Sequence, residues 1–322
     1  MVSRMSDSRF PFPFLVGSER SGTTLFRLML DAHPDMAVPP ESYFIVDLYR
    51  RRKSYERAGR PYDTVAVAND LAGSRWFRAW GMPPKELATA MRRGENVDFA
   101  EAMRKVYLGY ARMHGKSRYG DKTPAYVQHI RVLAEIFPEA RFVHLIRDGR
   151  NVALSLTEVT WGPSDVLEGA LQWRERVMRG RRAGAELGAH RYLEARYEHL
   201  VAEPEPVLRE VSEFIDLPFD DAMIRHSETA GERIPGRPDG LHRRAATAPV
   251  TGIRDWRQDM AREDLEAVEA AAGDLLEELG YERAVPDPSK EARRRAQMAA
   301  SRRARRHFVR RVKFFAKGNR RL

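Results

Sequence analysis

Residues 12–33 constrain the fold of this chain more than any other stretch. They read FPFLVGSERSGTTLFRLMLDAH, a short apolar run, then a glycine-bounded turn, then a segment whose apolar residues recur at helical spacing. A strand, a tight turn and a helix in this order predict a βα unit. Such a turn directs backbone N–H groups and the positive end of the helix dipole at one point, which favours a bound phosphate.

The turn matches the spacing of the nucleotide-binding P-loop with one difference. Its frame is Gly17-x4-Gly22-Thr23-Thr24, and Thr23 stands where that motif has lysine. Backbone and hydroxyl donors still suit a phosphate, but the positive charge that ATP enzymes place on the β- and γ-phosphates is missing. We therefore expect a nucleotide with a single 5′-phosphate group rather than a triphosphate. An ordinary turn rich in small residues is the alternative that this stretch alone leaves open.

Composition excludes several kinds of chemistry. The chain has 322 residues, enough for one large or two small domains with a full core. It has no cysteine, which excludes disulfides, a thiol nucleophile and cysteine-ligated metals. The residues up to Pro13 are polar and broken by proline, unlike a signal peptide, and no apolar run reaches the ~20 residues that span a bilayer. We expect a cytoplasmic protein.

The net charge of +10 is concentrated at one end of the chain. Residues 290–322 contain 14 Lys and Arg against one acid, Glu291, which leaves 42 basic and 45 acidic residues in the rest. The globular part is therefore near neutral, and we expect no nucleic-acid partner for it. The basic tail is compatible with a helix on an anionic membrane, with binding to nucleic acid or an acidic polymer, and with a solvated, partly disordered helix. Its large apolar residues are Phe308, Val309, Val312, Phe314 and Phe315.

Glu41 is a candidate general base. It follows Pro40 just after residues 36–38, which are compatible with a short second strand. Open parallel sheets bind ligands at the carboxyl ends of their strands. A partly desolvated acid at such an end suits proton abstraction, whereas a solvated loop glutamate is the alternative.

Lys122 is a candidate ligand for an anion. It precedes Thr123 and Pro124, a capping residue and a first-turn proline, at the start of a helix expected over residues 125–137. A lysine at a helix start opposes the helix dipole, so it makes more sense facing an anionic ligand. A surface lysine is the alternative.

A second phosphate site is expected after another strand. Residues 141–146 form a strongly apolar run that leads directly into Arg147. Ser155 lies eight residues later, about two turns into a helix that begins near Gly149. A guanidinium and a hydroxyl in this arrangement are suited to clamp a phosphate.

The rest of the chain reads as scaffold and lid. Residues 43–118 are mostly helical, with Asp98 as a helix cap, and are typical of a substrate-shaping insertion. Their aromatic group, Trp76, Phe77 and Trp80, is more typical of a local core than of a binding platform. Further helices are expected over residues 167–187, 204–215 and 263–279, a strand over residues 192–197, and a loop over residues 231–257.

The two phosphate motifs, with Glu41 and Lys122, resemble the sulfotransferases that use 3′-phosphoadenosine 5′-phosphosulfate (PAPS). RSGTT at residues 20–24, continued by LDAHP at residues 30–34, is similar to the family's 5′-phosphosulfate loop and the helix after it. RDGR at residues 147–150, with Ser155, is similar to its 3′-phosphate motif. The resemblance spans about residues 12–280 and is strongest to the tyrosylprotein sulfotransferases and related bacterial enzymes.

The resemblance implies a role for each candidate residue. Glu41 falls where the tyrosylprotein enzymes have their catalytic glutamate, and Lys122 falls where a transition-state lysine is expected. Glu41 would take the acceptor's proton, while Arg20 and Lys122 would stabilise charge on the sulfonate and the bridging oxygen. The residues that would hold PAPS are Arg20, Ser21, Gly22, Thr23, Thr24, Arg147, Ser155 and Tyr197, the last from an RYE segment at residues 196–198. Glu19 would place a negative charge near the loop, and we expect it to turn to solvent.

The implied fold is α/β, a P-loop-like arrangement of three layers with a central, mostly parallel sheet flanked by helices. A sulfotransferase domain is expected over residues 1–289, with 43–118 as its helical cap, and the basic tail 290–322 would be separate from it, with contact to an anionic membrane left open. The implied reaction transfers the sulfonate of PAPS to a hydroxyl without a metal. The acceptor stays open among a sugar, a lipid, a small phenol and a peptide, as do the residues of 231–257 that complete the cofactor site. A P-loop-type phosphotransferase and a non-catalytic nucleotide-binding protein are the alternatives.

Overall fold

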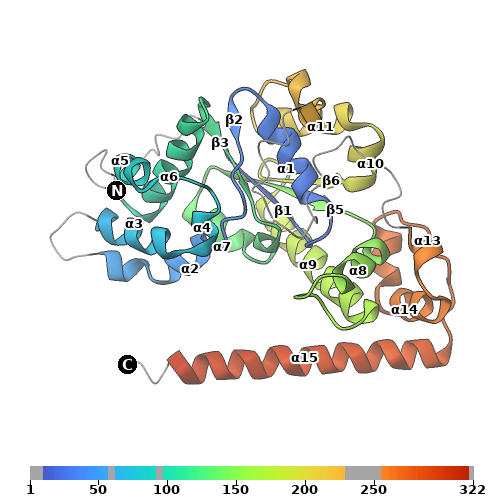
Figure 1. Cartoon of the computed structure of the whole chain (residues 1–322). Coiled ribbons are helices and arrows are strands. Elements are labelled where there is room, and N and C mark those ends of the chain that lie inside the picture. The colour runs from blue at the N-terminus through green and yellow to red at the C-terminus, as the bar shows by residue number, and fades with distance from the viewer. Residues whose placement is uncertain (1–9, 57–61, 92–96, 229–254, 319–322) are drawn as a thin grey trace. The chain divides into compact units, whose positions relative to one another are not determined.

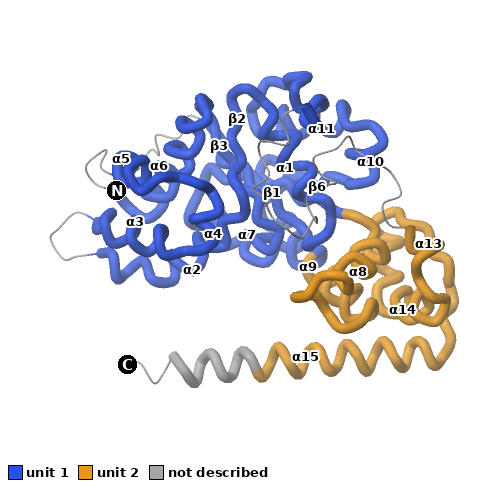
Figure 2. Tube along the Cα trace, viewed as in Figure 1, with its two compact units in different colours: residues 1–146, 177–251 blue, residues 147–176, 252–322 orange. Residues whose placement is uncertain are grey.

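The chain divides into two compact units (Figure 2). The computed structural model describes residues 10–56, 62–91, 97–228 and 255–318, with side chains up to residue 309. Unit 1 comprises Met1–Ile146 and Val177–Thr251, and unit 2 comprises Arg147–Arg176 and Gly252–Leu322. Most of the loop expected over residues 231–257 therefore lies outside the described residues.

A parallel sheet forms the centre of unit 1 (Figure 1). Its strands lie in the order β4-β1-β5-β6, and each neighbouring pair is parallel. Gly17 at the end of β1 pairs with Leu145 on β5, so the carboxyl ends of these strands lie side by side. The strands are β1 (Phe12–Gly17), β4 (Asp121–Lys122), β5 (Ala140–Ile146) and β6 (Tyr192–Arg196).

Both faces of the sheet are buried, as a parallel sheet requires. The sheet is thus the middle one of three layers. Side chains of β1 alternate between two cores, as strand geometry dictates. Phe14 packs with Phe137 and with Leu133 of α7 (Ile130–Ile136), whereas Leu15 packs on the other face with Phe26 and with residues of α11. The predicted α/β fold with a central parallel sheet is thus confirmed. The helices on the Leu15 face are α1 (Thr23–Ala32), α10 (Tyr197–Ala202) and α11 (Pro204–Phe214).

Residues 43–118 are mainly helical and contain a cluster of aromatic side chains. Asp98 accepts a hydrogen bond from the backbone N–H of Glu101 at 2.8 Å and caps α6, as expected. Phe77 and Trp80 are buried in the core, whereas Trp76 is half-buried and stacks on Tyr43 with ring centroids 4.3 Å apart. The helices are α2 (Phe44–Arg50), the 3₁₀ helix η1 (Arg52–Tyr55), α3 (Thr64–Gly73), α4 (Arg75–Arg78), α5 (Pro84–Met91) and α6 (Phe99–Met113). A second, small parallel pair joins β2 (Met36–Ala37) to β3 (Arg118–Tyr119).

The described part of unit 2 is helical. It contains α8 (Gly149–Thr157), α13 (Trp256–Asp259), α14 (Arg262–Glu278) and α15 (Lys290–Gly318), together with the first half of α9 (Val166–Leu187), whose second half belongs to unit 1. Gly169 on α9 allows close packing, because a Cβ there would lie 3.1 Å from the backbone of Ala153 on α8. Across the described ranges, no helix is long and apolar enough to cross a membrane.

Two expected elements differ in detail. The helix expected over residues 125–137 is split into the 3₁₀ helix η2 (Pro124–Gln128) and α7, separated by His129 at φ −124°. The buried Tyr126 hydroxyl accepts hydrogen bonds from Ser42 and from the backbone of Ile45, and this tertiary anchoring outweighs the local helical pattern. The strand expected over residues 192–197 ends at Arg196, and Tyr197 begins α10. Two short 3₁₀ turns, η3 (Asp221–Met223) and η4 (His226–Glu228), follow α11.

Candidate active site

The turn between β1 and α1 has the geometry of a phosphate-binding loop. Two of its residues adopt left-handed backbone conformations, Arg20 at φ 70° and Gly22 at φ 91°. The backbone N–H of Ser21 donates to the carbonyl of Ser18 at 3.2 Å and closes the turn. An arginine at positive φ is uncommon, and such conformations concentrate at functional sites.

Both glycines of the frame are required by close packing. A Cβ on Gly17 would lie 2.6 Å from the carbonyl oxygen of Leu145 on the neighbouring strand. A Cβ on Gly22 would lie 2.3 Å from ring carbons of Tyr197. The structure thus brings Tyr197, which the resemblance assigned to the cofactor site, against the loop. Glu19 is half-buried with its Oε2 shielded from water, so the expectation that it turns to solvent is wrong, because the tight turn keeps this side chain against the protein.

Glu41 and Lys122 meet beside this loop. Lys122 Nζ donates to Glu41 Oε1 at 2.8 Å and lies 3.5 Å from Thr24 Oγ1. The side chain of Lys122 is 4% exposed and that of Glu41 is 24% exposed, so the carboxylate faces the solvent and the ammonium lies beneath it. Lys122 is the last residue of β4, where it pairs with Leu15 of β1, and it directly precedes Thr123, the N-cap of η2, as expected. It is not a surface lysine. Burial lowers the pKa of Lys122, while Glu41 acts in the opposite direction.

A buried polar network holds the backbone on both sides of this pair. Ser42, next to Glu41, donates its N–H to Thr123 Oγ1 at 2.9 Å, and Thr123 is next to Lys122. Thr123 Oγ1 lies 3.4 Å from Asp121 Oδ2, which also accepts from the Tyr107 hydroxyl at 2.6 Å. Sequence reasoning missed this network because its members are up to 81 residues apart and none matches a motif.

Burial raises the pKa of Asp121 from 3.8 to about 6, although hydrogen bonds to this carboxyl act in the opposite direction. The folded state therefore binds this proton more tightly than the unfolded state, so the stability that it contributes is complete below about pH 4 and is lost as pH rises through about 6. Asp121→Asn removes this dependence. As pH rises from about 4 to 7, the free energy of unfolding of the variant should therefore increase by up to ~3 kcal/mol relative to that of wild type. Urea denaturation at each pH measures both values.

Asp47→Asn is the matched control for that prediction, because the Asp47 side chain is 69% exposed and its replacement should leave the pH profile unchanged. Parallel pH profiles for Asp121→Asn and wild type would contradict the assignment of a buried, proton-binding carboxyl.

Arg147 and Ser155 belong to unit 2. Arg147 directly follows β5, is buried, and its carbonyl accepts from Trp173 Nε1 at 3.0 Å. Ser155 is a buried residue of α8, which begins two residues after Arg147. The second phosphate motif therefore forms one local unit at the start of α8, capped by Asp148 through the N–H of Arg150.

Arg150 of the same motif has a different role. Its guanidinium is 1% exposed and lies 3.7 Å from the centroid of the Trp256 ring. It donates to Asp148 Oδ2 at 2.7 Å and to Glu269 Oε1 at 2.6 Å. Burial alone would lower the pKa of Arg150, but the two carboxylates outweigh it and raise the pKa. Because its donors are taken up inside unit 2, Arg150 organises this unit rather than offering a ligand site.

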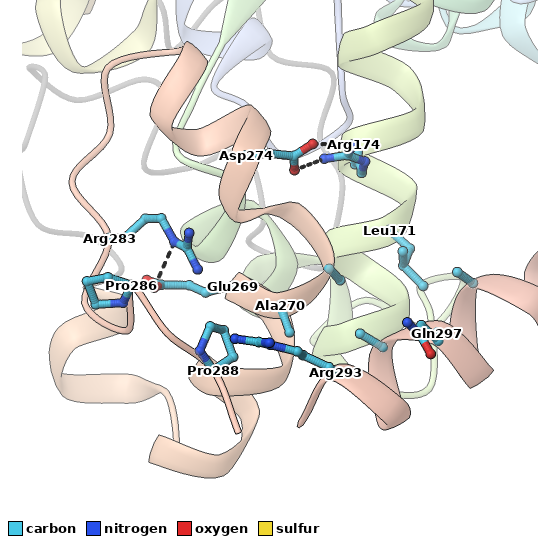
Figure 3. A pocket seen from close by; sticks show the side chains of 13 residues that line it. Leu171, Arg174, Glu269, Ala270, Asp274, Arg283, Pro286, Pro288, Arg293 and Gln297 are labelled. Atoms are coloured by element: carbon cyan, nitrogen blue, oxygen red, sulfur yellow. Dashed lines mark hydrogen bonds and ion pairs between the residues drawn. The ribbon is translucent and has the colours of Figure 1, made fainter. Parts of the chain in front are cut away.

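A hollow of about 530 Å³ also lies in unit 2, between α9, α14 and α15 (Figure 3). Arg174 pairs with Asp274 across it, and Arg283 Nε lies 3.8 Å from Glu269 Oε2. Two of the three arginines at its wall thus pair with the two acids there, and none of the residues expected to bind a nucleotide lines it. Within the part of the chain that the structure describes, no group of three or more His, Asp or Glu side chains is arranged to hold a metal ion.

Comparison with known proteins gives a consistent result. A sequence model described as "Sulfotransferase family" matches residues 11–221, a range that contains every candidate site residue. The chain is 26% identical over 231 residues to protein-tyrosine sulfotransferase A of Caenorhabditis elegans, covering 70% of this chain and 54% of that protein. It is 27% identical over 230 residues to protein-tyrosine sulfotransferase 1 of Danio rerio, covering 69% and 58%. The chain thus spans little more than half the length of these relatives.

A bacterial relative matches over a longer stretch. Nodulation protein NoeE of Sinorhizobium fredii is 27% identical over 309 residues, covering 87% of this chain and 69% of that protein. Among solved structures, the sulfotransferase domain from the Synechococcus PCC 7002 olefin synthase superposes with a TM-score of 0.59 at 25% identity, covering 86% of this chain and 98% of that domain. The sulfotransferase domain from the curacin biosynthetic pathway superposes with a TM-score of 0.56 at 18% identity, a likeness of fold.

Proposed function

The chain belongs to the sulfotransferase family, and from that premise we propose that it transfers the sulfonate group of PAPS to an acceptor hydroxyl. One observation carries this proposal. Glu41 and Lys122 are 2.8 Å apart, and Lys122 reaches toward Thr24 of the glycine-bounded loop. A solvent-facing carboxylate thus lies beside a buried cation at the loop, which is the arrangement that deprotonation of a hydroxyl next to an anionic donor needs.

The loop residues fit a 5′-phosphosulfate. The buried Ser21 Oγ has no hydrogen-bond partner among the described residues, and an oxygen of a bound phosphate would supply one. Thr23 and Thr24 open α1, so their N–H groups lie at the positive end of its dipole. The Tyr197 ring, in contact with Gly22, would form one wall of the cofactor site. Arg147 and Ser155 would hold the 3′-phosphate.

In this reaction, Glu41 accepts the proton of the acceptor hydroxyl. The acceptor oxygen forms a bond to sulfur as the bond from sulfur to the bridging oxygen of the phosphosulfate breaks. Lys122 and Arg20 stabilise the negative charge that grows on the bridging oxygen and the sulfonate. The products are the sulfated acceptor and 3′-phosphoadenosine 5′-phosphate (PAP). We propose no metal for this step, and the acceptor class is open among sugar, lipid, phenol and peptide hydroxyls.

Isothermal titration with PAP and with ATP, each with and without Mg²⁺, tests the proposal. We expect PAP to bind in the absence of Mg²⁺, to bind much more tightly than ATP, and to bind less tightly to Arg147→Ala. Preference for Mg-ATP would overturn the proposal in favour of a phosphotransferase. If PAP binds but PAPS is not consumed with any acceptor in a panel of the four classes, a non-catalytic nucleotide-binding role replaces it.

Gly22→Ala should abolish measurable PAP binding or weaken it at least tenfold. The added methyl would meet the Tyr197 ring at 2.3 Å, and φ 91° is unfavourable for alanine, so the loop or the ring must move. Gly115→Ala is the control, because Gly115 has φ 69° but has no atom within 4 Å of its Cβ position. Gly115→Ala has the unfavourable backbone conformation without a steric clash, so its PAP affinity should equal that of wild type. Equal affinities for all three proteins, measured by titration, would show that the loop does not contact PAP.

A further inference from the structure

The inner face of α15 is fixed to the rest of unit 2. Ala292, Ala296 and Ala299 are buried, and Ala299 packs with Leu167 of α9 and Ala267 of α14. Arginines beside this face are paired with acids of the same unit. These pairs are Arg295 with Asp264, Arg303 with Glu168 and Glu175, and Arg306 with Glu168. The first turns of α15 are thus a structural part of unit 2.

A different set of side chains lies on the remaining surface of α15. Arg294, Arg302 and Arg305 are exposed, and none of them forms an ion pair within the described ranges. Between and after them, three large apolar side chains are also exposed, Met298 at 51%, Phe308 at 69% and Val309 at 48%. This contrast with the paired arginines of the inner face indicates a surface that unit 2 does not use for its own packing.

Helical spacing places most of this set on one stripe. Residues 294, 298, 305 and 308 follow one another by four, seven and three positions, which keeps them on a common face of an α-helix. We refer to these four residues, together with Arg302 and Val309 at its edge, as the outer stripe. Arg302 also borders a hollow that Asp165 and Glu168 line. The inner alanines at 292, 296 and 299 follow their own helical spacing on another face.

The sequence continues the same composition beyond the described side chains. Residues 310–322 contain six Lys and Arg, no acid, and the large apolar residues Val312, Phe314 and Phe315. No acid follows Glu291 anywhere in the chain. Positive charge and large apolar residues therefore increase together toward the end of the chain, the composition of helices that lie in a membrane interface.

We propose that the outer stripe of α15 docks on an anionic lipid surface. The arginines would contact lipid phosphates, and Met298, Phe308 and Val309 would enter the boundary between headgroups and acyl chains. Nucleic acid would match the charge equally well, and its bases could stack on Phe308. The aliphatic Met298 and Val309 cannot stack in this way, so lipid accounts for both the charged and the apolar side chains of the stripe. This proposal is independent of the catalytic one, because it concerns binding by unit 2 and its test needs no turnover.

Sedimentation of the full-length protein with lipid vesicles tests the proposal. We expect binding to vesicles of phosphatidylcholine mixed with phosphatidylglycerol, little binding to phosphatidylcholine alone, and weaker binding as salt rises. The triple variant Arg294→Gln, Arg302→Gln, Arg305→Gln removes only exposed, unpaired charges and should weaken binding roughly 100-fold. The double variant Phe308→Ser, Val309→Ser should weaken it roughly tenfold or more without changing its salt dependence.

A control variant lowers the net charge equally without touching α15. Lys85→Gln, Arg112→Gln, Arg262→Gln alters three exposed residues of other helices and should bind vesicles as wild type does. If this control loses as much vesicle binding as the arginine variant does, net charge alone explains the binding, and the proposal is overturned. The proposal is also overturned if the wild-type protein does not bind the anionic vesicles. The stripe would be assigned to nucleic acid instead if duplex DNA displaced the protein from vesicles and the Phe308→Ser, Val309→Ser variant bound vesicles as tightly as wild type does.

Discussion

Replacing Glu41 with glutamine is expected to lower kcat by roughly 10²–10⁴-fold. Glutamine has nearly the same volume and can still accept a hydrogen bond from Lys122 Nζ, now 2.8 Å from Glu41 Oε1, but its amide cannot take up the acceptor's proton. The loss should therefore appear in kcat, whereas the affinity for PAP should change only a few-fold. Both are measurable, the first with PAPS and the best acceptor from a panel, the second by titration calorimetry.

Two comparisons decide whether that loss is chemical. Glu86→Gln makes the same substitution on an exposed residue of α5 and should retain wild-type turnover. Glu41→Asp keeps the carboxylate but shortens its reach, so it should retain more activity than Glu41→Gln. If Glu41→Gln turns over within a few-fold of wild type while PAP binding is intact, another group removes the proton and the role proposed for Glu41 is wrong.

Local sequence patterns were sufficient to predict the central unit of the fold. The apolar runs at residues 12–16 and 141–146 predicted β1 and β5, and the structure buries both strands on two faces. The glycine frame predicted the turn because Gly22 has a conformation and a contact that only glycine tolerates. Asp98 predicted the start of α6 because capping depends on the next three residues alone.

Contacts between distant residues could not be predicted in the same way. Strands β3 and β4 have two residues each, too few for a periodic pattern, so the helix start after Lys122 was predicted but its place in the sheet was not. Glu41 and Lys122 were separate candidates whose contact, 81 residues apart, follows only from the pairing of β4 with β1. Asp121 and Tyr107 of the network beneath them carry no sequence signal, because a buried aspartate cannot be distinguished from an exposed one by its neighbours in the chain.

The RDGR motif shows how one motif can contain two kinds of residue. The resemblance associated all four residues with a bound phosphate, but in the structure its two arginines have different surroundings. Arg147 precedes α8, whereas Arg150 points into the core of unit 2 and contacts three elements, α8, α13 and α14. An arginine in a ligand motif can therefore stabilise the scaffold that presents the ligand site.

Arg150→Met should destabilise unit 2 by about 3–5 kcal/mol, because methionine roughly fills the space of the arginine stem but leaves two buried acids without their cation. Asp148 would keep its bonds to Trp256 Nε1 at 3.1 Å and to the backbone of Arg150, and Glu269 would keep the N–H groups of Ala284 and Val285. None of these contacts carries a positive charge. Glu269 also keeps Arg283, but the Arg283 Nε lies 3.8 Å from Glu269 Oε2 and compensates its charge only in part. Urea denaturation, followed by the fluorescence of Trp256 and the other tryptophans, measures the loss.

The matched control is Arg174→Met, which breaks a pair of the same type at the surface of the same unit. Asp274, its partner, is 72% exposed, so water replaces the lost interaction and the expected cost is at most about 1 kcal/mol. Adding Glu269→Gln to Arg150→Met should recover part of the lost stability, since it removes one of the two carboxylate charges that lose their nearest cation. Equal stability of Arg150→Met and Arg174→Met would contradict a buried organising role for Arg150. Destabilisation without any recovery in the double variant would assign the loss to packing against Trp256 rather than to charge.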